Sequence, residues 1–185
     1  MTTNMHLASS DLMHGVRESF VQLRRHGYER IGLLLHPFHE RENQGVLHAA
    51  YMFETAGQPA RNRLPVLLLP DTDDESVRVA AFANWVPRHQ PDAVICCDEH
   101  VLEWARRLGI AVPGRLGLVH LNRHPYLKQW AGIDQREDQI GAAAVDLVIE
   151  QLIRGETGLP PSQKEVLIKG LWVDGVTLRR HTPAR

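Results

Sequence analysis

The 185-residue sequence lacks long apolar runs and an excess of charge of either sign. No apolar segment approaches the about 18 residues that a membrane span needs, and the N-terminus lacks the charged-then-apolar order of a signal peptide. The formal net charge of −1 gives no general attraction to nucleic acid or to anionic lipid. We therefore expect a soluble cytoplasmic protein with no membrane partner.

Cysteine is scarce, with only Cys96 and Cys97, which are adjacent inside an apolar run. Neighbouring side chains of a strand point to opposite faces, so we do not expect a disulfide between them. Reduced thiols fit a cytoplasmic compartment. Because burial raises the pKa of a thiol, neither cysteine is expected to act as a nucleophile.

Motifs of common catalytic sites are also missing. The chain contains no GxSxG, GxGxxG, P-loop or kinase signature. Its eleven histidines invite a metal site, but the closest cluster, His36-x-x-His39-Glu40, lacks the spacing that places two ligands on one helical face. We therefore predict no catalytic residue, no metal site and no cofactor.

The sequence does contain apolar runs that alternate with helical patterns. The runs, typical of strands covered on both faces, are Ile31–Leu35, Val66–Leu69, Ala93–Cys97 and Leu116–Leu121. Helical periodicity occurs at about 14–26, 41–56, 77–87, 101–108 and 136–154. Strands that alternate with helices predict an α/β fold with a parallel sheet and right-handed crossovers.

Local chemistry predicts the remaining segments. Residues 1–11 are polar and are expected to be poorly ordered. Residues 36–39 are expected to form a loop, because proline disfavours helix at and before its own position. Residues 123–130 are predicted to be a loop, and Glu165–Val173 a single strand. The apolar positions expected to face inward from the last helix are Ile140, Ala144, Leu147 and Leu152.

Polar residues follow two of the apolar runs. Asp98 and Glu99 come directly after Ala93–Cys97, and Asn122 ends the run that begins at Leu116. Ligands of open parallel sheets bind outside the carboxyl ends of the strands, so we expect a binding site there. Carboxylate and amide groups suit hydroxyl ligands. The alternatives are that the two carboxylates cap the next helix and that Asn122 is an ordinary turn residue.

The same stretch resembles the effector-binding domain of lactose-repressor-type (LacI/GalR) transcriptional regulators. The matching pieces are Asp98-Glu99, the helix after them, Gly109-Ile110-Ala111-Val112-Pro113 and Leu116–Asn122. Residues 131–135, residues 140–144, Ser10-Asp11, Gly15 and residues 27–31 resemble further family segments. They occur in the family's order over Ser10–Arg180.

The resemblance implies a periplasmic-binding-protein-like type I fold, a Rossmann-like three-layer sandwich with a parallel sheet. It also implies a truncated chain, because the helix-turn-helix and most of the first lobe have no counterpart. Residues 1–12 would be a disordered segment or linker, residues 13–180 the effector-binding domain (mainly the second lobe), and residues 181–185 a tail. The helices at 14–26 and 136–154 would lie on the first lobe, where their apolar stripes must pack otherwise or stay exposed.

For the ligand, the resemblance implies a small-molecule effector, expected to be a sugar. Its expected binding residues are Ser10, Arg41, Asp98, Asn122 and Gln135. Arg41 stands several residues before the family's arginine. No aromatic residue occupies the sugar-stacking position, which falls near Asp71.

For assembly, the resemblance implies a homodimer that uses the helix at 101–108. Leu102, Trp104 and Arg106 are the expected interface residues, with the alternative that Trp104 belongs to the core. DNA would be bound only through a helix-turn-helix absent from this chain, so the chain alone is not expected to bind DNA specifically.

The function implied is effector sensing, by a shift between open and closed arrangements of two lobes. The alternatives are a transport-type periplasmic sugar-binding protein of the same fold and a flavodoxin-like enzyme. A helix-turn-helix encoded upstream would indicate a regulator, whereas a signal peptide would indicate transport.

Overall fold

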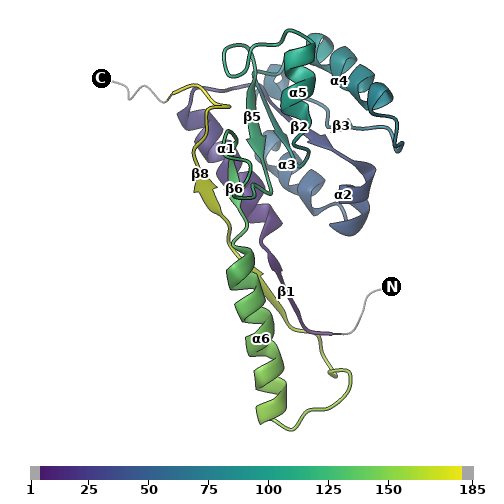
Figure 1. Cartoon of the computed structure of the whole chain (residues 1–185), viewed down its shortest axis with the longest axis vertical. Coiled ribbons are helices and arrows are strands. Elements are labelled where there is room, and N and C mark those ends of the chain that lie inside the picture. Colours follow the sequence, from purple (N-terminus) through teal and green to yellow (C-terminus); the bar gives the residue numbers. More distant parts are fainter. Residues whose placement is uncertain (1–4, 181–185) are drawn as a thin grey trace.

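A computed structural model of the chain describes residues 5–180, which form a large body and a projecting arm (Figure 1). We define the body as the six-stranded sheet with the helices packed on it. The arm is a two-stranded sheet with one long helix. No helix within residues 5–180 is long and apolar enough to cross a bilayer.

The sheet of the body has the strand order β3-β2-β4-β5-β6-β8. Its strands are β2 (Ile31–Leu35), β3 (Leu67–Leu68), β4 (Ala93–Cys96), β5 (Gly117–His120), β6 (Ala131–Asp134) and β8 (Leu171–Val173). The first five are parallel, and β8 pairs antiparallel with β6. This arrangement confirms the prediction of an α/β fold with a mainly parallel sheet.

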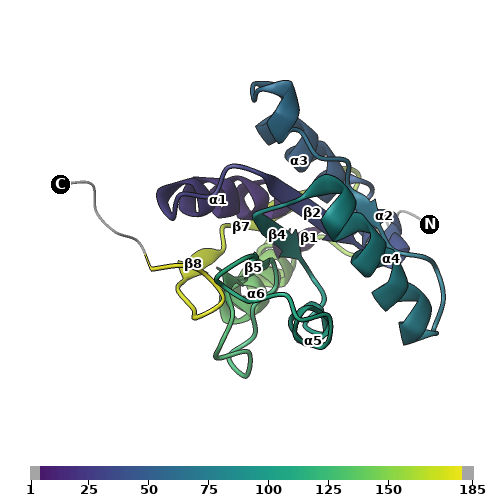
Figure 2. The ribbon, with the colours of Figure 1, turned by 90° about the horizontal axis from the view of Figure 1, so that it is seen from above.

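Helices cover both faces of this sheet. They are α1 (Leu12–Arg25) and α3 (Val46–Ala56) on one face, and α4 (Glu75–His89) and α5 (Val101–Arg107) on the other (Figure 2). Successive residues of β2 alternate between the two interfaces: Leu33 and Leu35 join the apolar cluster of α1, whereas Leu34 joins that of α4 and α5. Because every β2 residue is buried, the strand has a continuous apolar sequence.

The arm contains β1 (Leu7–Ser10), β7 (Glu165–Ile168) and α6 (Glu137–Ile153). The two strands are parallel, and α6 packs on them. Leu147 is the one buried residue of α6, while Leu152 and Ile153 are 72% and 81% exposed. Figure 1 shows the arm extending away from the body.

The predicted apolar stripes of the two outer helices have opposite outcomes. On α1, Val16, Phe20 and Leu23 are fully buried against the body, which is the first of the two expected outcomes, packing against another partner. On α6, the expectation of an inward stripe was wrong for Ala144 and Leu152, which are exposed. The arm has too little sheet to cover that helix face.

The predicted loop at residues 36–39 and helix at residues 41–56 are also corrected. The short helix α2 (Pro37–Glu42) begins at Pro37, where proline is favourable because the first helical N–H needs no partner inside the helix. Gln44 and Gly45 then adopt left-handed conformations, with φ of 50° and 74°, and end the helical path before α3. A single long helix is therefore replaced by two.

Long-range pairing explains the other differences. Residues 7–10, expected to be poorly ordered, form β1 because β7 pairs with them; residues 1–4 lie outside the described residues. The predicted strand Glu165–Val173 is two strands, separated by Lys169-Gly170, that belong to different sheets. The strand β6 and the 3-10 turn at Ala60–Asn62 were not anticipated.

Candidate ligand-binding pocket

A pocket of about 340 Å³ lies where the arm meets the carboxyl ends of the body strands. Its lining residues are Ser10, Leu12, His39, Asn43, Leu47, Cys97, Leu121, Asn122, Gln135, Glu137 and Ile140. Three of the five predicted ligand-binding residues, Ser10, Asn122 and Gln135, are therefore brought together.

Strand ends explain why these three meet. Ser10 is the last residue of β1, Gln135 directly follows β6, and Asn122 follows β5 by two residues. The parallel strands β5 and β6 present their carboxyl ends on the same side of the body sheet, which brings Asn122 and Gln135 together, and β1 of the arm ends beside them and adds Ser10. The pocket takes side chains from the body and from the arm.

Gln135 is the most enclosed polar residue of the lining, with 7% of its surface exposed. Its Nε2 donates a hydrogen bond to the carbonyl of Leu121, while its Oε1 is buried and has no partner among the described residues. A buried acceptor without a partner costs about 1–3 kcal/mol. A ligand hydroxyl could supply the missing donor.

Asn122 belongs to a short hydrogen-bonded chain at the pocket rim. Its Nδ2 lies 3.2 Å from His124 Nε2, and His124 Nδ1 lies 3.4 Å from Glu137 Oε1. The His124 tautomer with hydrogen on Nδ1 satisfies both contacts, because it accepts from the amide and donates to the carboxylate. This orientation leaves Asn122 Oδ1 with no partner within residues 5–180.

His120 supports Asn122 from the interior. Its Nδ1 accepts a hydrogen bond of 3.2 Å from the backbone N–H of Asn122, and its ring contacts Trp130 edge-on. Burial lowers the pKa of His120 to about 4, so the ring is neutral near pH 7. Neutral His120 keeps the acceptor that fixes the turn after β5.

His39 of α2 and Asn43, which directly follows this helix, were not predicted as ligand-binding residues. The backbone N–H of His36 donates to His39 Nδ1 at 3.4 Å, so the neutral ring carries its hydrogen on Nε2. Burial, and then the nearby His36, lower the pKa of His39 and favour this neutral form. The available signal was Pro37, two residues after the buried strand β2, since proline is favourable at the first position of a helix.

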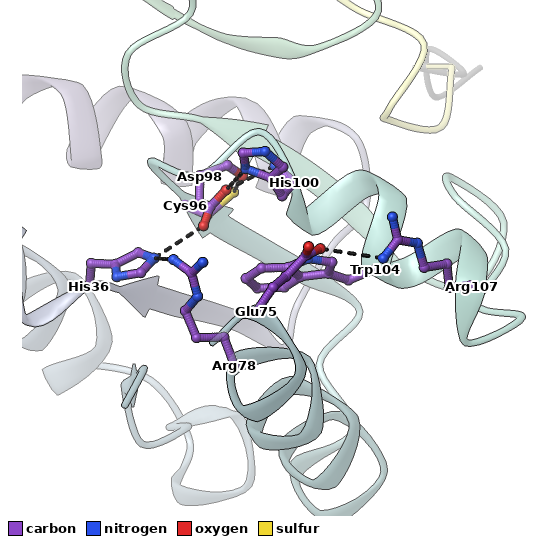
Figure 3. A network of polar contacts seen from close by, with 8 residues as sticks. All are labelled: His36, Glu75, Arg78, Cys96, Asp98, His100, Trp104 and Arg107. Atoms are coloured by element: carbon purple, nitrogen blue, oxygen red, sulfur yellow. Dashed lines mark hydrogen bonds and ion pairs between the residues drawn. The ribbon is translucent and has the colours of Figure 1, made fainter. Parts of the chain in front are cut away.

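Asp98 lies outside the pocket lining, in a separate polar network (Figure 3). One of its oxygens accepts from the backbone N–H and ring of His100, both at 2.9 Å, and the other lies 3.1 Å from His36 Nε2. Burial opposes ionisation of Asp98, but these hydrogen bonds outweigh it and hold the pKa of its carboxyl below the ordinary value. The contact with the His100 N–H forms a turn before α5, whose N-cap residue is His100 and has no side-chain cap, so Asp98 does not cap the helix as the alternative expected.

The same network joins three elements of the body. Arg78 of α4 lies 3.3 Å from His36 Nε2, which can accept from Arg78 or donate to Asp98. Nearby, Trp104 Nε1 donates to Glu75 Oε1 at 2.9 Å (Figure 3). These contacts tie α4 to the end of β2 and to α5, and they serve the structure rather than the pocket.

Arg41 also lies outside the pocket lining. Its guanidinium forms a 2.9 Å ion pair with Asp71, and both side chains are largely exposed. Asp71 is near the position that the family resemblance gives to the missing aromatic, whereas Arg41 stands several residues before the position of the family's arginine. Glu99 is likewise exposed and does not line the pocket.

The three residues expected at a dimer interface differ in their burial. Trp104 is fully buried against Phe82, so the core alternative stated for it describes its position, and Leu102, expected only at the interface, is also buried in the core. Arg106 alone lies at the surface, where it donates to Gln129 Oε1 at 3.0 Å. An interface on α5 would therefore use its exposed charged side, not Trp104.

The electrostatics of the pocket suit an uncharged polar ligand. Among the described residues, no lysine or arginine lines it, and Glu137 is its one carboxylate. No group of three or more histidine, cysteine, aspartate or glutamate side chains within residues 5–180 could hold a metal ion. Burial raises the pKa of the lining thiol Cys97 to about 12, with Asp98 adding to the effect, so it stays protonated.

Comparison with known proteins identifies the architecture. Residues 20–175 match the model of the periplasmic binding protein-like domain. No curated protein sequence matches the chain. Many solved structures do, and we describe three of them.

A xylose-binding transcription activator has a TM-score of 0.72 and 21% identity, covering 97% of this chain and 48% of the activator. A LacI family regulator from Arthrobacter sp. FB24, in complex with lactose, has a TM-score of 0.69 and 20% identity, covering 93% and 67% of the two chains. A periplasmic binding protein/LacI transcriptional regulator from Alkaliphilus metalliredigens, complexed with D-xylulofuranose, has a TM-score of 0.69 and 13% identity, covering 96% and 67%.

The chain is thus shorter than the proteins it resembles. It spans about half to two thirds of their length. At these low identities the likeness shows the fold, while the ligands belong to those proteins.

Proposed function

Because this chain belongs to the periplasmic binding protein-like domain family, we propose that it is the effector-sensing part of a LacI-type transcriptional regulator and binds a small uncharged sugar. The observation that carries this proposal is the pocket at the carboxyl ends of the strands. It gathers Ser10, Asn122 and Gln135 from three separate strand ends, and the buried Oε1 of Gln135 has no partner among the described residues.

The chemistry of the lining favours hydroxyl ligands. Gln135 and Asn122 offer acceptors, and the neutral ring of His39 carries a donor hydrogen on Nε2. Several similar structures contain sugars, among them ribose, lactose and D-xylulofuranose. The absence of a cationic side chain among the described lining residues argues against sugar phosphates and sugar acids.

We further propose that the ligand acts by linking the arm to the body. Gln135 and Asn122 belong to the body, whereas Ser10 and Glu137 belong to the arm. A ligand that contacts both parts favours the arrangement in which both sets of contacts form. In a full-length regulator, this shift would reposition the DNA-binding segment.

Calorimetric titration with a panel of neutral pentoses, hexoses and disaccharides tests the proposal. We expect one sugar to bind, and Asn122→Ala to weaken its affinity about tenfold by removing a hydrogen-bonding group. Gln139→Ala is the matched control, since this exposed amide lies near the pocket but does not line it. Matching sugar phosphates should bind more weakly.

The titration is made with this chain and with the full-length product of its gene, since similar proteins are longer. Unchanged affinity in Asn122→Ala, measured on a protein that binds the sugar, would reject the assigned pocket. Binding that follows the phosphate group instead of the sugar would reject the neutral ligand class.

A further inference from the structure

A second hollow, of about 670 Å³, lies at the opposite end of the body strands from the proposed sugar-binding pocket, which is called the sugar pocket below. We call it the basic hollow. Its lining residues are Gln22, Arg25, His26, Asp174, Gly175, Leu178, Arg179 and Arg180. They come from the end of α1 and from the segment after β8, which lie beside each other at the far end of the molecule from α6 (Figure 1).

The charge of this hollow is unusual for a chain with a net charge of −1. Arg25, Arg179 and Arg180 line it, and none of them forms an ion pair within the part of the chain that the structure describes. The one carboxylate of the lining, Asp174, has a side chain that is 82% exposed and lies 4.0 Å from His26. The local excess of positive charge is therefore not neutralised by the fold.

Arg179 is held in a defined orientation. Its guanidinium carbon lies 4.7 Å from the centre of the Tyr28 ring, and its backbone N–H donates to the Tyr28 hydroxyl at 2.9 Å. The Nε atom of Arg179 is buried without a partner among the described residues. Stacking thus positions the cation, while one buried donor remains unsatisfied.

Stabilisation of a helix end explains only one of the three arginines of the basic hollow. Arg25 lies in the last turn of α1, where a cation complements the negative end of the helix dipole. Arg179 and Arg180 follow β8 and have no such role. His26 Nδ1 contacts the carbonyl of Arg179 at 2.6 Å, which holds the two segments together.

We propose that the basic hollow is an anion site that binds the phosphate group of a small phosphorylated molecule, separately from the sugar pocket. Guanidinium groups offer paired N–H donors that match phosphate oxygens, and three of them around one hollow can neutralise a dianion. The hollow is large enough for a phosphate with an attached sugar-sized group. This chain would then carry one site for a neutral ligand and one for an anionic ligand.

The test is calorimetric titration of the full chain with pyrophosphate, and then with inorganic phosphate, at low ionic strength. We expect saturable one-to-one binding. Arg25→Gln and Arg180→Gln should each weaken it about tenfold, since each removes charge-assisted hydrogen bonds. Both side chains are exposed, so both variants should fold, which circular dichroism verifies.

Arg24→Gln is the matched control. Arg24 is adjacent on the same turn of α1, but it contacts the carbonyl of Glu54 and does not line the basic hollow. We expect it to change the affinity less than about twofold.

Three results would overturn the proposal. They are no saturable binding of either anion, an equal loss of affinity in Arg24→Gln, and a glutamate-rich peptide that binds at these arginines more tightly than pyrophosphate. The last result would assign the hollow to an acidic protein segment. Neutral-sugar binding should be unaffected by Arg25→Gln, so the two sites are tested independently.

Discussion

The body buries the apolar face of the less apolar helix, α1, whereas the arm leaves much of the more apolar helix, α6, exposed. On α1, Val16, Phe20 and Leu23 are completely buried, whereas α6 leaves Leu152 and Ile153 largely in solvent. The body offers α1 a six-stranded sheet, and the arm offers α6 two strands. An apolar stripe therefore shows which side of a helix can be buried, while the size of its partner determines whether it is buried.

The largest expected contrast comes from truncating one apolar side chain in each region. Phe20→Ala should lower the free energy of unfolding by about 3–5 kcal/mol, because it leaves a cavity in the body core. Leu152→Ala on α6 should change it by less than about 0.5 kcal/mol, because the side chain is already exposed. Urea denaturation of both variants measures the difference. Similar losses would mean that the arm is covered in solution.

The second largest expected effect is a loss of stability of the body at acidic pH. His120 has a pKa of about 4 in the folded body against about 6.5 in an unfolded chain. Below pH 6.5 the unfolded state binds a proton that the folded state does not, so stability falls with pH down to about 4. The loss should reach roughly 3 kcal/mol.

This acid dependence is measured by urea denaturation at several pH values, followed by tryptophan fluorescence. All four tryptophans belong to the body. His120→Asn keeps an acceptor for the Asn122 N–H and removes the titrating ring, so it should flatten the dependence between pH 6.5 and 4. An equally steep dependence in His120→Asn would assign the effect to other groups, such as His39, whose pKa is also lowered.

The smallest expected effect concerns the exposed pair between Arg41 and Asp71. Arg41→Ala should change stability by less than about 0.5 kcal/mol, because exposed ion pairs contribute little. It should also leave sugar affinity within about twofold, because Arg41 does not line the pocket. Denaturation and calorimetry of this variant provide the measurements. A tenfold loss of sugar affinity would mean that the ligand-binding site includes Arg41 and extends beyond the junction of body and arm.

The sequence was sufficient to predict the strands whose burial is evident from their own residues. The strands β2, β4 and β5 lie within continuous apolar runs and were predicted, because burial on both faces removes alternation. The strands β1, β7 and β8 were not predicted correctly. Leu7–Ser10 pair with Glu165–Ile168, which lie near the other end of the chain, so no local sequence pattern indicates the pairing.

The pocket was predictable to the extent that backbone position determines it. Asn122 was predicted from its position after a buried apolar run, whereas Ser10 and Gln135 were implied only by the family resemblance, because the strands β1 and β6 that place them were not predicted. Asp98 occupies an equivalent position, yet its side chain turns toward His36 and His100. The direction of a side chain depends on its neighbours in space, which the sequence did not reveal. His39 was missed because α2 was expected to be a loop.

The short helix α2 has a further consequence for how ligand selectivity can change. It carries His39 and Asn43 to the pocket, yet none of its own six residues is buried. The left-handed residues Gln44 and Gly45 separate it from α3, whose Leu47 and Tyr51 belong to the core. Substitutions in α2 can therefore alter one wall of the pocket at little cost to folding. Ligand selectivity can change in this way while the core of the body stays the same.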